Sequence, residues 1–369
     1  MLVNLQFERR PLLFDSPVSL ITAYTPEGLR ACFRGMEEAS RAGYHLAGFL
    51  SYEAGYCLGE SFPYSGKSDF PLILMGVYRP PRRMLYREEG RPDFLVKHRR
   101  MDTGKEKYSA NISLIRDFIS AGEIYQLTYC NKLFFDFSGS ASALYSSLLK
   151  KQPVPYPAYL RWQDTHICSL SPELFFRKSG GFILVKPMKG TWRRGRGLLA
   201  DLREYRRFRV DPKNRAENVM IADLLRNDLG RIGGRVRAPG LFEIGAYSTL
   251  FQMTSTVTAV IPKEIPFYEI FRALFPSGSV TGAPKLRAMR IIRDIENGPR
   301  NIYTGAIGCI TPGREMFFNV PIRTLLIRGG RGEMGIGGGI VWDSTPEGEW
   351  EESMLKTEFF TAGASDFKK

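Results

Sequence analysis

Two side chains that could act as an acid and a nucleophile lie close together in the chain. Glu173 stands in LSPELFF (170–176) and Lys189 in VKPMKGTWRRG (185–195). The pattern predicts adjacent strands of a hairpin, where a Glu and a Lys usually form a plain ion pair. In a cleft they could instead be an acid and a nucleophile. Free lysine has a pKa near 10.4, so that role requires a decrease worth about 4 kcal/mol. Burial or a nearby metal cation would supply it.

The first of two further carboxylates is predicted to face the interior from a helix. Glu217 shares a helix face with Ile221 and Leu224 in DPKNRAENVMIADLLRNDLG (211–230). A buried carboxylate needs a partner because an unpaired buried charge is costly. An arginine could be the partner of Glu217. A metal ion is the alternative, because two inward carboxylates on different helices, with water or substrate oxygens, suit Mg²⁺.

The second such carboxylate is Glu352, on a helix predicted after Ser344-Thr345-Pro346. Glu352 shares a predicted stripe with Leu355 and Phe359, which indicates an inward side chain. Acids in a first helical turn are expected from the helix dipole, and Glu352 with Lys356 is an ordinary i,i+4 ion pair. These explanations cover most of the acids in 347–352 without a metal.

Two glycine-rich segments could bind an anion. PSGSVTGAPK (276–285) leads into a helix N-terminus, where free N–H groups and the helix dipole attract negative charge. It is not a P-loop, since the spacing is wrong and no Ser or Thr follows Lys285. A tight turn before a capped helix explains it equally well. GIGGGI (335–340) resembles a dinucleotide fingerprint but does not satisfy it, because Ile340 stands where the last Gly or Ala belongs.

Helices and long runs of strands must position these residues. Helices are predicted over 108–121, 211–230 and from 285 to near 298, with a last one after Pro346. Strands are predicted near 124–137, 157–163, 167–177, 182–187, 250–261, 303–311, 315–328 and 334–341. Because the strands come in runs, the sequence predicts an α+β fold with largely antiparallel sheets. The proline-rich, basic stretch 79–107 is predicted to be a linker or an exposed excursion.

Composition narrows the functional classes. The chain has 369 residues, and its five widely spaced cysteines fit reduced thiols better than a disulfide framework. Its three histidines make a zinc site improbable. No apolar run is long enough to span a bilayer, and Glu8 interrupts any signal-peptide core, so we expect a cytoplasmic protein that does not associate with membranes.

The formal net charge is +14. It fits a nucleic-acid-binding protein or an enzyme for a small anionic substrate. The basic residues are dispersed and match no nucleic-acid-binding motif, so no nucleic-acid partner is expected.

The segments together resemble the chorismate-utilising enzymes, a family that includes anthranilate, aminodeoxychorismate, isochorismate and salicylate synthases. The matching stretches, in order, are GEIYQLTYCNK (122–132), SLSPELFF (169–176), PMKGTWRRG (187–195), 211–232, FPSGSVTGAPKLRAM (275–289), RNIYTGAIG (300–308), FFNVPIRTL (317–325) and GIGGGIVWDSTPEGEWEE (335–352). They cover about 108–360. The resemblance implies a catalytic domain over 108–362 and a short N-terminal region, 1–107, packed on it.

The resemblance also implies the fold and the roles of site residues. It implies two antiparallel sheets packed face to face, helices outside, and chorismate with Mg²⁺ in a cleft between the sub-domains. Glu217 and Glu352 would bind the Mg²⁺, and Glu173 would be the general acid. The substrate would be held by Arg323, Tyr303, Lys356, Gly337, Gly338, Gly339, Thr281 and Gly282. An arginine fork suits a carboxylate, and chorismate carries two.

Two positions discriminate within the family. Lys189 stands in P-x-K-G-T, which resembles the aminodeoxychorismate synthases, whereas anthranilate synthases carry Ala there. Gln126 stands where the water-adding members place a lysine base, and a glutamine cannot deprotonate water. The implied reaction has Lys189 attack C2 of chorismate while Glu173 protonates the departing C4 hydroxyl. Ammonia then adds at C4 and expels the lysine.

The ammonia would come from a separate glutamine amidotransferase subunit. Anthranilate synthase component I is the alternative enzyme, and a non-catalytic basic binding protein on the same fold is the alternative of another class. Two features depart from the family pattern. Gln252 stands where many members have His, and the short N-terminal region, with LFDS at 13–16, makes a tryptophan pocket doubtful.

Overall fold

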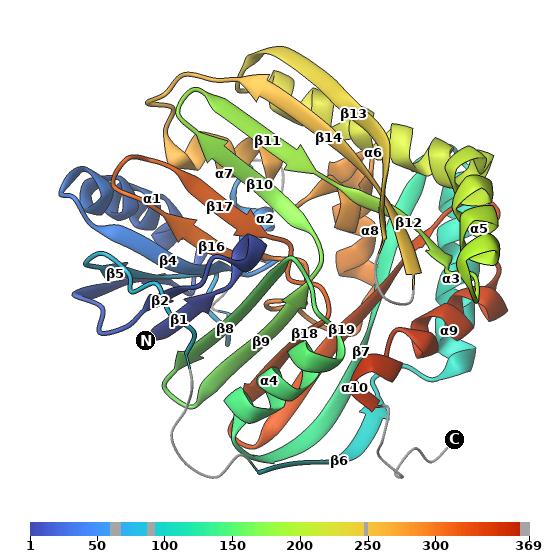
Figure 1. The fold of residues 1–369 in the computed structure, drawn as a ribbon, viewed down its shortest axis with the longest axis horizontal. Helices are drawn as coiled ribbons and strands as arrows, with labels where there is room; N and C mark the ends of the chain where they lie inside the picture. Colours follow the sequence, from blue (N-terminus) through green and yellow to red (C-terminus); the bar gives the residue numbers. More distant parts are fainter. Residues whose placement is uncertain (60–67, 87–92, 247–249, 362–369) are drawn as a thin grey trace.

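Two large antiparallel sheets, together with ten α-helices, form the described part of the chain in a computed structural model (Figure 1). The described residues are 1–59, 68–86, 93–246 and 250–361. Every strand pairing within the two sheets is antiparallel, which confirms the predicted α+β class. No helix among these residues is both long and apolar enough to cross a membrane.

The first sheet has nine strands. Their order is β15 (Gly282–Ala283), β7 (Gln126–Gly139), β19 (Arg331–Ile340), β18 (Thr324–Arg328), β9 (Thr165–Ser171), β8 (Tyr156–Trp162), β1 (Leu2–Leu5) and β2 (Leu12–Phe14), with β6 (Phe94–Met101) also paired to β7. The long β7–β19 pairing sets Gly339 opposite Thr128 and Gly337 opposite Cys130. Two predicted site segments therefore lie side by side.

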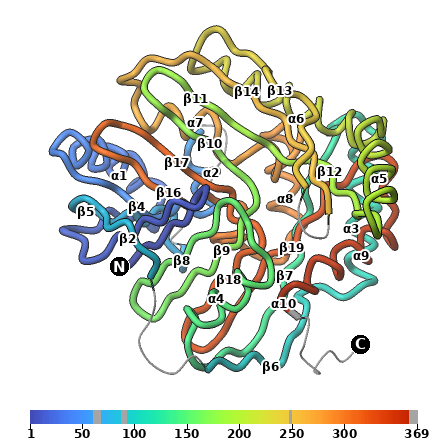
Figure 2. The backbone as a smooth tube through the Cα atoms, viewed as in Figure 1, coloured from blue at the N-terminus to red at the C-terminus, as the bar shows by residue number. Residues whose placement is uncertain are grey.

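The second sheet has ten strands. Their order is β12 (Met188–Arg193), β14 (Leu250–Val260), β11 (Phe182–Lys186), β10 (Leu174–Ser179), β17 (Met316–Asn319), β16 (Ala306–Ile310), β4 (His45–Leu50), β5 (Ile73–Tyr78) and β3 (Ser19–Ala23), with β13 (Gly234–Ala246) also paired to β14. Residues 1–107 thus supply strands to both sheets. Figure 2 shows the N-terminal segment running beside β8, to which β1 pairs.

The helices cover the sheets and frame their right-hand edge in Figure 1, where α3, α5 and α9 lie. They are α1 (Pro26–Arg41), α2 (Ala54–Cys57), α3 (Lys105–Ser120), α4 (Ala141–Lys151), α5 (Leu198–Val210), α6 (Pro212–Gly230), α7 (Phe267–Leu274), α8 (Lys285–Ile295), α9 (Pro346–Leu355) and α10 (Glu358–Thr361). The helix α6 begins as its sequence predicts. The Asp211 side chain accepts a hydrogen bond from the Asn214 N–H at 2.8 Å, and Pro212 occupies the first helical position.

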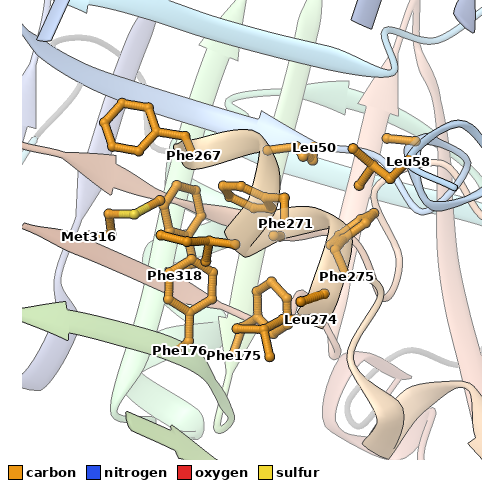
Figure 3. Packing of buried hydrophobic residues seen from close by; sticks show 14 of the residues in the cluster. Leu50, Leu58, Phe175, Phe176, Phe267, Phe271, Leu274, Phe275, Met316 and Phe318 are labelled. Carbon is orange, nitrogen blue, oxygen red and sulfur yellow. The ribbon is translucent and has the colours of Figure 1, made fainter. Parts of the chain in front are cut away.

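An aromatic cluster holds α7 against the second sheet. Figure 3 shows Phe271 of α7 facing Phe176 of β10 and Phe318 of β17. The Phe176 and Phe318 rings stack at 5.4 Å, and the Phe271 ring meets Phe318 edge-on at 5.3 Å. Each fully buried phenylalanine contributes about 1.5–3 kcal/mol. A second cluster joins the two sheets, with Tyr156 and Leu326 of one packing near Phe49 and Ile307 of the other.

Two expectations about elements were wrong. The stretch 79–107 is not simply a linker, since residues 94–101 form β6 along β7; its residues 87–92 lie outside the described part. The second concerns the predicted hairpin of Glu173 and Lys189. The hairpin is formed by β10 and β11, and Lys189 lies beyond it on β12, because the chain leaves the ladder at Pro187.

Candidate active site

Glu173 lies between β9 and β10 and is buried. Its carboxylate accepts a hydrogen bond of 2.5 Å from the Ser279 hydroxyl. Burial raises the pKa of Glu173 to about 7, although the Ser279 bond, the Lys189 charge and the Met188 N–H each lower it. A carboxyl group with this pKa is partly protonated at neutral pH, so it can donate a proton.

Lys189 lies on β12, half-buried, with its amine next to β19. Its Nζ lies 3.0 Å from the position that a Cβ on Gly339 would occupy. Burial lowers the pKa of Lys189, and the charge of Lys356 lowers it further, whereas Glu217 and Glu173 raise it. The side-chain amide of Asn218 on α6 donates to the Lys189 carbonyl oxygen at 3.1 Å and so ties the strand to the helix. The lowered pKa shifts the protonation equilibrium of the amine toward its neutral, nucleophilic form.

Side chains of several predicted site residues crowd the glycines of β19. A Cβ on Gly337 would lie 2.4 Å from the Tyr303 hydroxyl, and one on Gly339 would lie 2.4 Å from Nε2 of Gln126. A Cβ on Gly338 would lie 3.0 Å from a carboxylate oxygen of Glu349. Only glycine lets the strand approach these groups without a shift. The glycines therefore let polar side chains from other elements lie directly against the backbone of β19.

Tyr303 and Lys356 both bond the backbone of Gly337. The Gly337 N–H donates to the buried Tyr303 hydroxyl, and the Lys356 amine donates to the Gly337 carbonyl oxygen at 2.8 Å. Lys356 also forms an ion pair of 2.7 Å with Glu352. The predicted substrate-binding residues Tyr303, Gly337 and Lys356 are thus in direct contact.

Three carboxylates form an acidic group, and two of them, Glu217 and Glu352, interact with Lys189. Glu217 comes from α6, and Glu349 and Glu352 come from α9. Burial raises the pKa of Glu217, and the negative charge of Glu352 raises it further. The positive charges of Lys189 and Lys213 lower it. Burial also raises the pKa of Glu349. Lysines, not the arginine considered from the sequence, are the nearby cations.

The prediction that Glu352 points inward on a stripe with Leu355 and Phe359 was wrong. The Glu352 side chain is 56% exposed. Leu355 is exposed as well, and α9 ends there, so Phe359 belongs to a different helix. The prediction assumed one continuous helix through Phe359, whereas α9 ends at Leu355. Glu349 is the more buried acid, and its place among first-turn acids concealed it in the sequence.

The acidic group could contribute to a divalent-cation site. Nowhere in the described ranges do three His, Cys, Asp or Glu side chains form a metal site by themselves. Glu217 and Glu352 nevertheless interact unfavourably as like charges, and a cation would relieve that repulsion. Two carboxylates with further oxygens from substrate and water are a donor set that Mg²⁺ accepts. The residues therefore fit Mg²⁺ with a substrate bound.

The polar groups of the loop 276–285 mostly bond to other parts of the fold. They are therefore not available to bind an anion in the way the sequence suggested. Thr281 is fully buried, and its hydroxyl donates to the Ser277 carbonyl oxygen at 3.0 Å. Gly282 pairs with Leu127 of β7, and Lys285 forms a 2.5 Å ion pair with Asp228. The lysine is therefore used inside the fold. The loop's contribution to the site is Ser279, which the sequence did not single out.

Arg323 lies directly before β18 with a left-handed backbone, φ 50°. Its carbonyl oxygen accepts a bond of 3.0 Å from the Leu170 N–H. In the same loop the Val320 N–H donates to the Glu173 carbonyl oxygen at 3.1 Å. The loop that carries Arg323 is thus fixed to the backbone of the candidate acid.

Several buried polar atoms near these residues have no partner in the described part of the chain. They are both amide atoms of Gln126, the hydroxyl of Thr128 and the side-chain oxygen of Gln252. Gln126 is 1% exposed, and its amide lies beside Gly339. Leaving such groups unpaired costs about 1–3 kcal/mol each, so a polar ligand would satisfy them. Gln126 marks where that ligand would lie.

Comparisons with known proteins show the family to which the chain is related. Residues 6–362 match the family model described as chorismate binding enzyme. The chain is 35% identical over 252 residues to aminodeoxychorismate synthase component 1 of Salmonella typhimurium, covering 68% of this chain and 56% of that protein. It is 34% identical over 262 residues to anthranilate synthase component 1 of Acinetobacter calcoaceticus, covering 69% and 53%. The matches span less than two thirds of these relatives.

Solved structures share the fold. Anthranilate synthase component I from Streptococcus pneumoniae superposes with a TM-score of 0.78 at 21% identity, covering 97% of this chain and 89% of that chain. A putative 2,3-dihydroxybenzoate-specific isochorismate synthase from Bacillus anthracis also gives 0.78, at 18% identity, covering 97% and 94%. Because the family model spans almost the whole chain, this protein belongs to the chorismate binding enzyme family.

Proposed function

We propose that the protein is the chorismate-aminating component of an aminodeoxychorismate synthase. It would convert chorismate and ammonia to 4-amino-4-deoxychorismate. The observation that carries the proposal is Lys189, a lysine with a lowered pKa beside the candidate acid Glu173 and the glycines of β19. The relative from Salmonella typhimurium and a chloroplastic relative from Arabidopsis thaliana, 38% identical, are both aminodeoxychorismate synthases, which supports it.

The reaction would proceed through two substitutions. The neutral Lys189 amine forms a bond to C2 of chorismate, the ring double bonds shift, and the C4–O bond breaks. Glu173 gives its proton to the leaving oxygen, so water departs. Ammonia then forms a bond to C4, the double bonds shift back, and the C2–N bond to Lys189 breaks. Lys189 leaves as the neutral amine, and the proton lost by the new C4 ammonium group returns to Glu173, which restores the site.

Glu217 and Glu352 would hold Mg²⁺, with Glu349 close to Glu352. When bound, the ion would neutralise a substrate carboxylate and the repulsion within the acidic group. Arg323, Tyr303, Lys356, Thr281 and Gly282 would bind or surround the substrate. Gln126 has no basic nitrogen, which disfavours activation of water as the nucleophile.

A second component would supply the ammonia. The relatives in Salmonella typhimurium and Escherichia coli carry the name component 1, which supports a partner of complementary function. We propose that this partner is a glutamine amidotransferase.

A product assay tests the proposal. The purified chain is incubated with chorismate, Mg²⁺ and ammonium at mildly alkaline pH, and the product is identified by mass and fluorescence. We expect 4-amino-4-deoxychorismate, reduced by roughly 100-fold or more in Lys189→Ala. The partner amidotransferase is added with glutamine in a parallel reaction.

The assay also distinguishes the alternative. Anthranilate with pyruvate as products would favour anthranilate synthase, in line with the Acinetobacter calcoaceticus relative. Full activity in Lys189→Ala would contradict the covalent step. As a matched control, Lys150→Ala changes an exposed lysine of α4 and should leave the rate unchanged.

A further inference from the structure

Two serine hydroxyls form a row behind the candidate acid. The Ser279 hydroxyl donates to Oε1 of Glu173 at 2.5 Å, and the Ser277 hydroxyl lies 2.9 Å from that of Ser279. All three side chains are buried. In an interior that excludes water, each hydrogen bond of such a row polarises and strengthens the next. The position of the Glu173 proton therefore depends on how the two hydroxyl protons are oriented.

The row has one direction in which every hydroxyl proton has an acceptor. A serine hydroxyl has a single proton to donate. When the Ser279 proton points to Glu173, the Ser277 proton points to Ser279, and both protons are used. In the reverse direction Glu173 donates to Ser279 and Ser279 donates to Ser277, which leaves the Ser277 proton without an acceptor among the described residues. Because an unpaired buried donor is costly, the first direction is favoured.

This direction decides which oxygen of Glu173 carries the proton. Oε1 accepts from Ser279, so the proton of the neutral acid is left to the other oxygen, Oε2. Within the described ranges no side chain donates to Oε2. The backbone N–H of Met188 is a further donor to the carboxylate. The two oxygens of the acid are therefore not equivalent.

The loop that carries both serines is fixed next to Ser279. The Arg300 guanidinium donates to the Val280 carbonyl oxygen at 2.9 Å. The Thr128 N–H of β7 donates to the Thr281 carbonyl oxygen at 2.7 Å. The loop backbone therefore holds the Ser279 hydroxyl in place before any proton moves, as a preorganised site requires.

Charged side chains near the acid are independent of the two serines. Lys189 is the charged side chain that acts on Glu173, and its positive charge lowers the pKa of the acid. The charged side chains that act most strongly on Lys189 are Glu217, Glu173, Lys356 and Glu352. A change at Ser279 leaves all of them in place, so it removes a hydrogen bond without removing a charge.

We propose that Ser279, with Ser277 behind it, is a positioning residue for the general acid, because it keeps Oε1 of Glu173 as an acceptor and leaves the transferable proton on Oε2. In the reaction the Oε2–H bond breaks as the proton forms a bond to the departing C4 oxygen. The Ser279 hydroxyl then stabilises the carboxylate that remains. The position of the proton stands on the geometry alone, whereas its use in turnover rests on the proposed function.

The first test does not require turnover. The glutamate side-chain carboxyl carbons of the full chain are labelled with carbon-13, and the Glu173 signal is assigned by its absence in Glu173→Gln. NMR follows this signal as the pH changes. Removing a donor to a carboxylate raises its pKa, so the midpoint in Ser279→Ala should rise by about one pH unit from the wild-type value of about 7. Ser277→Ala should shift the midpoint in the same direction by less.

Two control variants accompany this titration. Ser279→Thr keeps a hydroxyl donor and should retain the wild-type midpoint. Ser40→Ala is the matched control, because it removes another buried hydroxyl, which bonds the Thr311 carbonyl oxygen from α1. An unchanged midpoint in Ser279→Ala, or an equal rise in Ser40→Ala, would overturn the proposal. Should Ser279→Ala not fold, an unchanged midpoint in Ser277→Ala would overturn it instead.

The second test uses the pH profile of chorismate consumption. Consumption is followed instead of one product, so the result holds whether the chain forms 4-amino-4-deoxychorismate or anthranilate. We expect kcat to fall roughly tenfold or more in Ser279→Ala. The alkaline decrease of kcat/KM should move to higher pH by the shift seen in the NMR titration, because both report the free enzyme. A purely structural effect would lower the rate without moving this decrease.

The two tests separate this proposal from the proposed function. A lower rate with an unmoved alkaline decrease in Ser279→Ala would reject the role in turnover and leave the proposed function intact. No consumption of chorismate by the wild type, even with the partner and glutamine, would reject the proposed function and with it the role in turnover. The NMR titration would still decide which way the serine row points.

Discussion

Burial determines the protonation of Glu173, the acid proposed for the reaction. Glu173 is an ordinary glutamate in the sequence, and its pKa near 7 comes from burial at the β9–β10 junction. Its hydrogen-bond donor, Ser279, is 106 residues away. Sequence motifs located both segments. The contact between them, and the more buried Glu349, depend on tertiary packing that residue spacing does not contain.

The pH dependence of the reaction follows from these two groups. Glu173 must be protonated to donate, so kcat/KM should fall as the pH rises above about 7. Lys189 must be neutral to attack, so kcat/KM should fall at lower pH, with the midpoint below that of free lysine. A bell-shaped profile is expected from initial rates of product formation.

Glu173→Gln isolates the acid. The glutamine keeps the shape and the bond from Ser279 but cannot donate a proton to the leaving oxygen. We expect kcat to fall roughly 100-fold or more and the alkaline decrease to disappear. An alkaline limb that persists in this variant would assign it to another group.

At the scale of elements, the sequence predicted α3, α6, α8 and α9, whereas α1 and α4 were missed although each has an N-terminal signal. The boundaries of α6 agree with Asp211, Pro212 and Gly230. The strand β13 was missed because its residues alternate around glycines and a proline without a strong apolar face. The helix α5 was missed since Leu198 and Leu199 are exposed and most of its other residues are charged.

The N-terminus of α6 should control both stability and the position of Lys189. The Asp211 carboxylate caps the helix and also accepts from the Asn214 side chain at 2.7 Å, and a Cβ on Gly190 would lie 2.7 Å from Asn214. Asp211→Ala should therefore cost about 1 kcal/mol in unfolding free energy and reduce kcat. Urea unfolding and initial rates measure the two effects.

Asp223→Ala is the matched control on the same helix. The Asp223 side chain is 73% exposed and pairs only at the surface with Arg226, so its removal should change stability by a few tenths of a kcal/mol. Equal losses of activity in both variants would mean that the cap has no specific effect on β12.

At the scale of the whole molecule, the fold keeps two acids buried that an unfolded chain would expose. Glu53 and Glu173 both have pKa values raised to about 7, mainly by burial. In the unfolded chain they titrate near 4.5. Between these values the folded protein holds protons that the unfolded chain has lost, so each acid makes folding less favourable as the pH rises from about 4.5 to 7. Above about 7 the penalty is constant.

Replacing Glu53 should reveal its share of this dependence. Glu53→Gln removes the charge but also one acceptor for the N–H groups of Arg300 and Asn301, so it lowers stability at acidic pH. Its stability should then fall less steeply than that of the wild type between about pH 5 and pH 8, by up to about 3 kcal/mol. Denaturant unfolding at both pH values measures the difference.

Glu38→Gln, an exposed change on α1, should keep the wild-type slope. An identical slope in Glu53→Gln would mean that Glu53 does not gain a proton on folding, and that the 52–56 segment is solvated more than its burial indicates.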